Sequence, residues 1–238
     1  MLYIVGIGFP SLISSLARVA IESAELVVGY TPYIEEIAPI LRSNQKTFAN
    51  GMRGEVERVT YAVDEAARGA QVCIVCSGDP SLYGMAALAY QLAAGRGVEI
   101  SVIPSVTAAM AASAKLGAPI TDDLVILSLS DLLTPKELID RRIEAVNIGD
   151  FVCAIYNPRS KSRTEALPSA LKKFREARGN LLVGAVTNAF REGESVTIAT
   201  IDTFDVSIVD MFTLVLVGSS RTQLIDGKMV TPRGYRVS

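Results

Sequence analysis

Short apolar runs alternate with longer stretches of helical periodicity along the chain. Nearly continuous apolar strands between helices are typical of parallel strand–helix–strand units whose sheet is buried on both faces. The first half is therefore predicted to be an α/β domain with a mainly parallel sheet. Its predicted strands span residues 2–8, 25–29, 72–76 and 98–104, and its predicted helices span residues 14–23, 32–41, 54–68, 83–94 and 106–115.

The second half shows the same alternation, although its predicted strand at residues 196–200 is shorter and is flanked by polar residues. Asp226-Gly227 is a signal for a type I′ hairpin turn, which predicts that this half holds a mixed sheet. Leu-Gly-Ala-Pro at residues 116–119 breaks the pattern between the halves. We therefore expect an N-terminal α/β domain of residues 1–117 and a C-terminal α/β domain of residues 118–238. The predicted strands of the second domain span residues 124–130, 151–156, 181–187, 196–200 and 211–217.

Composition limits the kinds of partner that this chain of 238 residues would have. The net charge is −2, whereas nucleic-acid binders normally carry a basic surplus, so no nucleic-acid partner is expected. No uninterrupted apolar stretch reaches roughly 18 residues, so no membrane span is expected. The first residues lack the basic start of a signal peptide, and the three cysteines form no disulfide framework. A cytoplasmic protein is the expectation.

The chain contains no histidine. This excludes Ser-His-Asp and Cys-His catalytic arrangements and histidine-rich zinc sites, and we expect no metal site. Cys73 and Cys76 have metal-site spacing, but residues three apart in a strand point to opposite faces, which indicates packing. The reaction must therefore need little acid–base help, or must use a carboxylate, a lysine, a tyrosine or water.

The loops after the predicted strands carry the unusual residues, and ligands of open α/β sheets bind beyond the carboxyl ends of strands. Gly6 and Gly8 lack the third glycine and the acidic residue of a dinucleotide-binding fingerprint, which disfavours a nicotinamide cofactor. Asp79 before Pro80 predicts a helix N-cap, and Gly78 beside it would let a ligand approach the backbone. Both interpretations of this turn stay open.

Three further loops place polar or basic residues at strand ends. Thr107 begins a small-residue helix, either as its cap or as a ligand contact. Ser128 and Ser130 share one face of a predicted strand by its period of two, and Asp131 follows them. Residues 159–163 hold three cations and no acid, which favours binding of anionic groups, although a solvated loop would have the same composition.

Five segments together resemble the tetrapyrrole methyltransferase superfamily, also called class III methyltransferases, over essentially the whole chain. They are Gly-Met-Arg at 51–53, Ser-Gly-Asp-Pro at 77–80 with Tyr-Gly-Met-Ala at 83–86, Ser-Leu-Ser-Asp-Leu-Leu-Thr-Pro at 128–135, Tyr-Asn-Pro-Arg-Ser at 156–160, and Asp-Gly-Lys-Met-Val-Thr-Pro-Arg-Gly-Tyr at 226–235. Gly-Asp-Pro marks the superfamily, whereas the segments at 128–135 and 156–160 in this order are more specific. The chain is most similar to the branch of precorrin-3B and cobalt-factor III C-17 methyltransferases.

The resemblance implies two α/β domains with an active-site cleft between them, in a homodimer. It implies S-adenosyl-L-methionine as methyl donor, S-adenosyl-L-homocysteine as product, and a small-molecule tetrapyrrole that is methylated at C-17 with ring contraction in cobalamin biosynthesis. The cofactor contacts that it implies are Phe9, Gly78, Asp79, Leu82, Val106, Thr107, Ala108, Tyr156, Asn157, Ala189 and Thr213. Because corrin precursors carry several carboxylates, the candidate substrate contacts are Arg53, Ser128, Ser130, Arg159, Lys161 and Arg163.

A sulfonium methyl group is already activated, so such an enzyme mainly positions its reactants, and positioning can lower a barrier by roughly 7–11 kcal/mol. Ring contraction also needs proton movements. The candidates for the acid or base are Asp131, Asp122 and Tyr83, and the sequence does not select among them. Asp122 stands where the branch usually has histidine, which puts any catalytic role of that histidine in doubt here.

The chain departs from the family's glycine turns at Phe9-Pro10, Ser81 and Ser105. Glycine is favoured at positive φ, and proline is confined to φ near about −65°. We therefore expect these loops to adopt negative φ and still to shape an open cofactor cleft, with Phe9 against it. Three alternatives stay open: a sibling enzyme that acts at another tetrapyrrole carbon, a diphthine synthase, and a cofactor-binding module without turnover.

Overall fold

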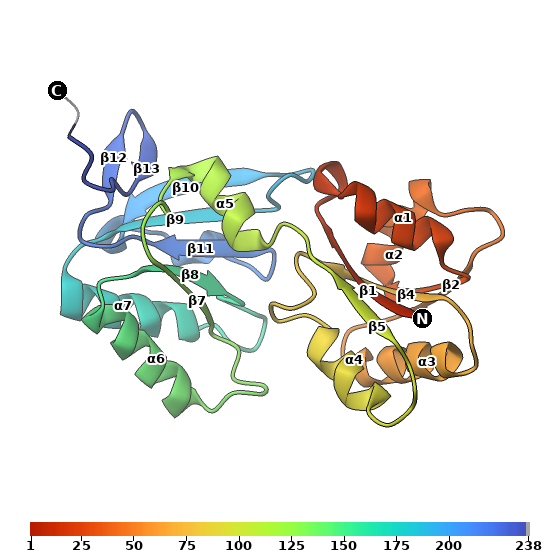
Figure 1. The fold of residues 1–238 in the computed structure, drawn as a ribbon. Coiled ribbons are helices and arrows are strands. Elements are labelled where there is room, and N and C mark those ends of the chain that lie inside the picture. The colour runs from red at the N-terminus through yellow and green to blue at the C-terminus, as the bar shows by residue number, and fades with distance from the viewer. Residues whose placement is uncertain (237–238) are drawn as a thin grey trace. The chain divides into compact units, whose positions relative to one another are not determined.

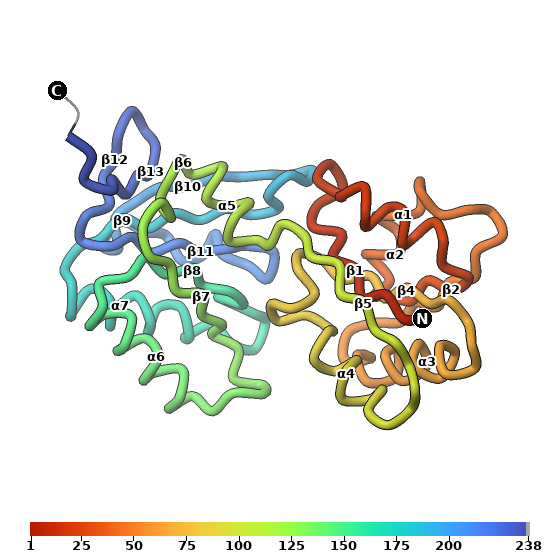
Figure 2. The backbone as a smooth tube through the Cα atoms, viewed as in Figure 1, coloured from red at the N-terminus to blue at the C-terminus, as the bar shows by residue number. Residues whose placement is uncertain are grey.

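The computed structural model of the chain describes residues 1–236. Its contacts group into two compact units, one of Met1–Thr107 and one that begins at Ala108. Each unit is an α/β structure with its own sheet (Figure 1). The smooth trace in Figure 2 follows the chain through the first unit before it enters the second. No helix among residues 1–236 is both long and apolar enough to cross a bilayer.

The first unit is a five-stranded parallel sheet with strand order β3-β2-β4-β1-β5. The mainly parallel sheet expected from the sequence is thus confirmed. Its strands are β1 (Leu2–Gly8), β2 (Leu26–Tyr30), β3 (Lys46–Asn50), β4 (Val72–Ser77) and β5 (Ile100–Ile103). Its helices are α1 (Ser15–Ser23), α2 (Thr31–Ile37), α3 (Glu55–Ala67) and α4 (Ala86–Ala93), with 3₁₀ helices at Pro10–Leu12 and Ala38–Ile40.

Both faces of this sheet are buried, as continuous apolar strands require. Leu2 and Ile4 of β1 pack with α3 and α4, whereas Val5 and Ile7 pack with α1 on the other face. Cys73 and Cys76 of β4 divide between the two faces in the same way, and burial raises the pKa of the Cys76 thiol to about 11. The packing interpretation of this cysteine pair is confirmed.

The second unit has a mixed main sheet of order β10-β9-β11-β8-β7. Only β7 and β8 pair in parallel; β11 runs antiparallel to both of its neighbours. The strands are β7 (Leu124–Ser128), β8 (Val152–Tyr156), β9 (Leu182–Thr187), β10 (Ser195–Thr200) and β11 (Thr213–Val217). The helices are α5 (Ala108–Leu116), α6 (Lys136–Ile148) and α7 (Ala166–Arg178), with 3₁₀ helices at Ile201–Thr203 and Val206–Ile208.

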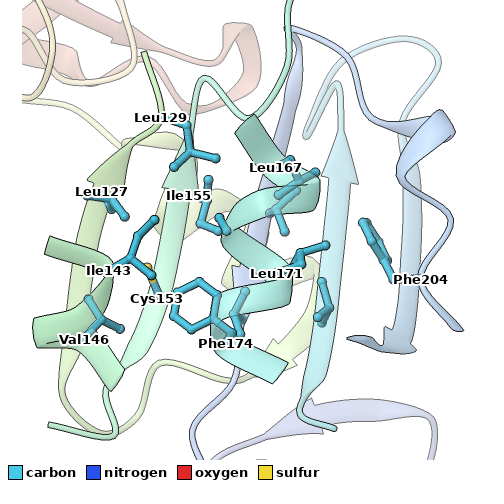
Figure 3. Packing of buried hydrophobic residues seen from close by; sticks show 14 of the residues in the cluster. Leu127, Leu129, Ile143, Val146, Cys153, Ile155, Leu167, Leu171, Phe174 and Phe204 are labelled. Atoms are coloured by element: carbon cyan, nitrogen blue, oxygen red, sulfur yellow. The ribbon is translucent and has the colours of Figure 1, made fainter. Parts of the chain in front are cut away.

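Helices α6 and α7 cover one face of this sheet. Phe174 and Leu171 of α7 and Ile143 of α6 point into a core that includes Ile155 of β8 and Leu127 of β7 (Figure 3). Alternation along β9 turns Gly184 to the opposite face, where α5 packs on β9 and β11. The sheet is therefore covered on both sides by helices of its own unit.

The predicted hairpin at Asp226-Gly227 is present, with φ of 47° and 74° at its two central residues. Its strands β12 (Gln223–Ile225) and β13 (Lys228–Val230) pair in antiparallel fashion. They form a separate small sheet with the short strand β6 (Gly117–Ala118), not part of the main sheet. The main sheet is mixed because β11 runs antiparallel between β8 and β9 and β10 runs antiparallel beside β9, which the hairpin signal did not reveal.

The division between the units falls earlier than the expected boundary after residue 117. Helix α5 belongs by its contacts to the second sheet, because Leu116 fills the space above Gly184. A Cβ atom on Gly184 would lie 2.5 Å from a Leu116 methyl carbon, so the glycine is what allows this close approach. Whether an independent domain begins at residue 118 stays a prediction.

Two features of the first unit differ from the sequence prediction. Strand β3 was not predicted, because it is an edge strand in which Phe48 is the only large apolar residue and most side chains are exposed or half-buried. Helix α4 begins at Ala86, later than predicted, with Met85 as its N-cap. Asp79 therefore caps no helix, and the N-cap interpretation of this residue is wrong.

Asp150 joins three segments of the second unit. Its carboxylate accepts hydrogen bonds from Ser220 N at 2.9 Å, from Ser220 Oγ at 2.5 Å and from Arg178 Nη1 at 3.0 Å. Burial alone would raise the pKa of this carboxyl, but the hydrogen bonds from Ser220 and Arg178 outweigh burial and lower the pKa below its ordinary value. The folded state therefore favours the ionised form of Asp150.

We predict that Asp150→Asn lowers the free energy of unfolding at pH 7 by about 1–2 kcal/mol, at the low end for charged hydrogen bonds because the carboxylate is 38% exposed. The stabilisation is present above the ordinary aspartate pKa and is lost as the pH falls through the lowered value. The difference from the unchanged protein should therefore shrink below about pH 4. Urea unfolding between pH 7 and pH 3 measures it.

Asp226→Asn is the matched control, because Asp226 also has positive φ but lies exposed in the hairpin turn. It should leave stability unchanged at every pH. An equal loss of stability for Asp150→Asn at pH 7 and pH 3 would contradict the assigned role of the ionised carboxylate.

Candidate active site

Three strand-end loops of the first unit meet at one edge of its sheet. They follow β1, β4 and β5, which are adjacent and parallel. Gly8 and Gly78 exchange backbone hydrogen bonds, with N···O distances of 3.3 and 3.4 Å. A Cβ atom on Gly6 would lie 2.6 Å from the Gly78 oxygen and 2.8 Å from Ser105 Cβ, so glycine is needed for the loops to close on one another.

Asp79 ties two of these loops together. Its Oδ1 accepts a hydrogen bond from Ser81 N at 2.8 Å, and its Oδ2 accepts one from Ser105 N at 3.0 Å. Its backbone oxygen accepts from Leu82 N at 3.3 Å, which closes a turn. Both carboxylate oxygens thus bind the chain itself, and Asp79 fixes the shape of the edge.

Backbone and small side chains make up this edge, and we call the loops around Gly6, Gly8, Gly78 and Ser105 the glycine cradle. Gly78 has a φ of 62°, and a Cβ atom added to it would meet nothing closer than Thr107 at 3.8 Å. The carbonyl oxygen of Val106 lies 3.4 Å from the position that a Cβ atom on Gly8 would take. Ser105 Oγ is buried and has no hydrogen-bond partner within the described residues. Open backbone and an unpaired hydroxyl fit a ligand that is recognised by hydrogen bonds at close range.

The altered turns adopt the backbone that the sequence predicts. Ser81 and Ser105 are not among the described residues with positive φ, whereas Gly8 and Gly78 are. Phe9 has an extended backbone, with φ of −130° and ψ of 151°, and its side chain is buried. The prediction of negative φ at the substituted positions is confirmed, and the place of Phe9 against a cofactor cleft stays a prediction.

The second unit also gathers its polar residues at one edge. Ser128 pairs with Tyr156 at the carboxyl ends of β7 and β8, and Thr213 pairs with Thr187 where β11 begins and β9 ends. Because β11 runs antiparallel to β8, its first residue lies at the same edge as the ends of β7, β8 and β9. Ala189 follows β9 there. The strand-end residues Ser128, Tyr156 and Thr213 are thus brought to one edge of the sheet.

Side-chain hydrogen bonds organise this edge. Tyr156 Oη accepts from Ala109 N at 2.9 Å, in the first turn of α5, which places Ala108 beside it. Asn157, which has a φ of 50°, donates through Nδ2 to Ser128 Oγ at 2.9 Å. Ser130 lies in the turn after the strand and not on its face, since β7 ends at Ser128.

The loop after β9 holds residues that the sequence prediction missed. Asn188 and Phe190, on either side of Ala189, have φ of 50° and 57°. Positive φ at a bulky residue such as Phe190 is uncommon and marks strain that other contacts must hold. Glu194 supplies one such contact, accepting from Phe190 N at 2.7 Å and pairing with Lys115 Nζ at 2.9 Å. Asparagine is enriched at positive φ, so Asn188 carries a weak sequence signal, whereas nothing in the sequence marks Phe190.

Two of the three cations of the basic loop bind the protein itself. Arg159 Nη1 donates to the carbonyl oxygens of Val206 at 3.0 Å and Ser207 at 3.5 Å. Arg163 donates to the carbonyl oxygen of Asn157 at 3.2 Å. Lys161 is exposed.

The remaining candidates lie apart from one another. Asp122 forms an ion pair with Arg221 at the amino end of β7, the opposite edge from Ser128, where both line a cavity of about 220 Å³. Tyr83 is exposed, with a φ of 54°, in the turn between β4 and α4. Arg53, with a φ of 67°, follows β3 at the far side of the first sheet. Among residues 1–236, no group of three or more Cys, Asp or Glu side chains is placed to hold a metal ion.

Comparison with known proteins identifies the family of the chain. The family model described as Tetrapyrrole (Corrin/Porphyrin) Methylases matches residues 1–205. The chain is 40% identical to the "Probable cobalt-factor III C(17)-methyltransferase" of Methanocaldococcus jannaschii, over 99% of this chain and 98% of that protein. It is 43% identical to "Cobalamin biosynthesis protein CbiHC" of Archaeoglobus fulgidus, over 98% of this chain but only 52% of that longer protein.

A solved structure, of "the methyltransferase CobJ", is similar with a TM-score of 0.91 and 33% identity. The match covers 97% of this chain and 99% of that one. The full-length likeness in fold and the family match agree with one another. The chain belongs to the tetrapyrrole (corrin/porphyrin) methylases.

Proposed function

We propose that this protein methylates C-17 of cobalt-factor III, with contraction of the ring, in cobalamin biosynthesis. The observation that carries the proposal is the match to the Methanocaldococcus relative over nearly the whole of both chains at 40% identity. Tetrapyrrole methylation is the activity of the family, and S-adenosyl-L-methionine is the methyl donor that the family implies. Precorrin-3B, the cobalt-free counterpart, is the second substrate to test.

The glycine cradle and the edge of the second sheet supply the groups that would hold the cofactor. When bound, S-adenosyl-L-methionine would supply an activated methyl group from its sulfonium. The donor would be left as a neutral thioether. The chain itself would hold the reactants in place. In the first unit Gly78 exposes its backbone and Asp79 fixes the loop through its two hydrogen bonds, and in the second unit Tyr156 and Asn157 are the proposed contacts. The proposed contacts are Phe9, Gly78, Asp79, Leu82, Val106, Thr107, Ala108, Tyr156, Asn157, Ala189 and Thr213.

The substrate would combine carboxylates with a large flat ring. Lys161 and Arg53 are exposed cations that can meet carboxylates, and Arg159 stands in the same loop as Lys161. Leu132 and Leu133 follow β7 with 77% and 98% of their surface exposed, which suits contact with the face of a ring. Ser128 and Ser130 stand at the start of the same loop.

Proton movements during contraction would fall to the acid or base candidates. Asp131 lies at the edge that holds Ser128 and Asn157, and Tyr83 follows β4 beside the cradle loops of the first unit. Asp122 is the weakest of the three, because it is paired with Arg221 at the opposite edge of its sheet. The homodimer, the cleft between the domains and the cytoplasmic location stay predictions.

The direct test is incubation with methyl-labelled S-adenosyl-L-methionine and either cobalt-factor III or precorrin-3B, followed by mass spectrometry and carbon NMR. We expect transfer of one labelled methyl group to C-17. Label at another carbon would identify a sibling methyltransferase. Binding of S-adenosyl-L-homocysteine without transfer to either substrate would indicate a cofactor-binding module, and the proposed activity would be wrong.

A glycine pair tests the cofactor cradle separately. Gly78→Ala and Gly69→Ala both force a side chain onto positive φ, at 62° and 99°, so both should destabilise the fold by about 1–2 kcal/mol. Only Gly78 lies in the cradle; Gly69 follows α3. Calorimetry should show S-adenosyl-L-homocysteine binding weakened about tenfold or more by Gly78→Ala and unchanged by Gly69→Ala. Equal affinities for the two variants would remove Gly78 from the cofactor site.

A further inference from the structure

Arg163 has a different environment from the other cations of its loop. Its side chain is only 14% exposed. Nη2 donates to the carbonyl oxygen of Asn157 at 3.2 Å, and Nη1 donates to Asp131 Oδ1 at 3.4 Å. Nε is buried without a partner within the described residues. The guanidinium is thus directed into the protein and bound there, so it is not available to pair with a substrate carboxylate.

A tight turn sets this direction. Ser160 and Arg163 exchange two backbone hydrogen bonds of 3.2 Å each, which folds the loop back on itself. The fold returns Arg163 to Asn157, six residues earlier in the chain. Arginine suits this place because its planar fork carries donors in fixed directions, so one side chain can bind a backbone oxygen and a carboxylate together.

The two partners of Arg163 belong to different parts of the proposed site. Asn157 is a proposed cofactor contact with positive φ, and its side chain holds Ser128 of the neighbouring loop at 2.9 Å. Asp131 lies in that neighbouring loop with 53% of its side chain exposed, so its carboxylate remains available to a ligand. Leu129 N donates to Tyr156 O at 3.0 Å, which links the same two loops through the backbone.

We infer that Arg163 is a positioning residue: it holds the Asp131 carboxylate, a proposed acid or base for the substrate, and the backbone of Asn157, a proposed cofactor contact. The inference rests on the proposed function for the identity of both ligands. An ion pair at 3.4 Å with a half-exposed partner contributes little to stability, so its main effect is on geometry. Small displacements of positioned groups reduce turnover far more than they reduce stability.

The test compares Arg163→Gln, Arg163→Lys, Asp131→Asn and the double variant Arg163→Gln/Asp131→Asn in the full chain. Arg163→Gln should lower kcat about 10- to 100-fold and leave KM for the tetrapyrrole within about twofold. Binding of S-adenosyl-L-homocysteine should weaken about three- to tenfold, through loss of the hydrogen bond to Asn157. The double variant should be no slower than the slower single variant, because both changes break one pair.

Arg163→Lys separates the two contacts. A lysine can restore a charge beside Asp131 but cannot reproduce the fork, so kcat should recover in part while cofactor binding stays weak. Lys161→Gln is the matched control for an exposed cation of the same loop and should raise KM without lowering kcat. If Arg163→Gln behaves like Lys161→Gln, Arg163 binds substrate carboxylates directly and the inference is wrong. Additive effects in the double variant would also overturn it.

Hydrogen exchange provides a measurement that does not depend on turnover. In Arg163→Gln, the amides of Leu129 and Ser130 should exchange at least about tenfold faster, while the β8 amides keep their protection. Unchanged exchange at these two amides would refute the positioning role even if the enzyme methylates cobalt-factor III. Faster exchange in a protein that transfers no methyl group would instead uphold the role of Arg163 and reject the proposed function.

Discussion

In the first unit, β1 pairs in parallel with both β4 and β5, so three consecutive carboxyl ends meet at one edge. The loops that leave these ends have little room, and Gly6, Gly8 and Gly78 are the residues that let them touch. Asp79 then fixes the meeting point with one carboxylate, through the amides of Ser81 and Ser105. Every group proposed to contact the cofactor from this unit depends on that closure.

The second unit also gathers strand ends at one edge of its sheet, but its strands are mostly antiparallel. Only one strand pair of its main sheet is parallel, yet the antiparallel insertion of β11 brings Thr213 to the edge where β7, β8 and β9 end. In the first unit backbone contacts hold the loops together, whereas in the second unit side chains do so. Asn157 donates a hydrogen bond to Ser128, and Tyr156 accepts one from the first turn of α5. A chain without histidine can serve this reaction, because methyl transfer from a sulfonium mainly requires that the donor and the acceptor carbon are correctly aligned.

Much of the fold followed from apolar periodicity, but contacts between distant segments did not. The pattern located β1 and β4 because buried strands are continuous and apolar, and it missed β3 because an exposed edge strand lacks that signal. Residue type identified Gly78 and Asp79 as notable, although local rules assigned Asp79 to a helix that begins only at Ala86. Hydrogen bonds to residues far along the chain determine what such a side chain does.

The partners of charged side chains likewise could not be predicted from the sequence. Composition grouped the cations of the basic loop, but it could not show that Arg159 and Arg163 turn to backbone oxygens while Lys161 stays exposed. Asp122 and Asp131 are close in sequence and stand at opposite edges of one sheet, because β7 lies between them. A strand of five residues is enough to separate two carboxylates that look equivalent in the sequence.

The packing of Leu116 over Gly184 also bears on how this chain can be divided. Helix α5 covers one face of the second sheet, so a fragment that starts after this helix would leave the apolar side chains of that face, such as Val186, Leu214 and Leu216, open to water. Such a surface favours self-association over solubility. In fusion, circular permutation or separate expression of the second unit, we therefore expect Ala108–Leu116 to be needed for solubility.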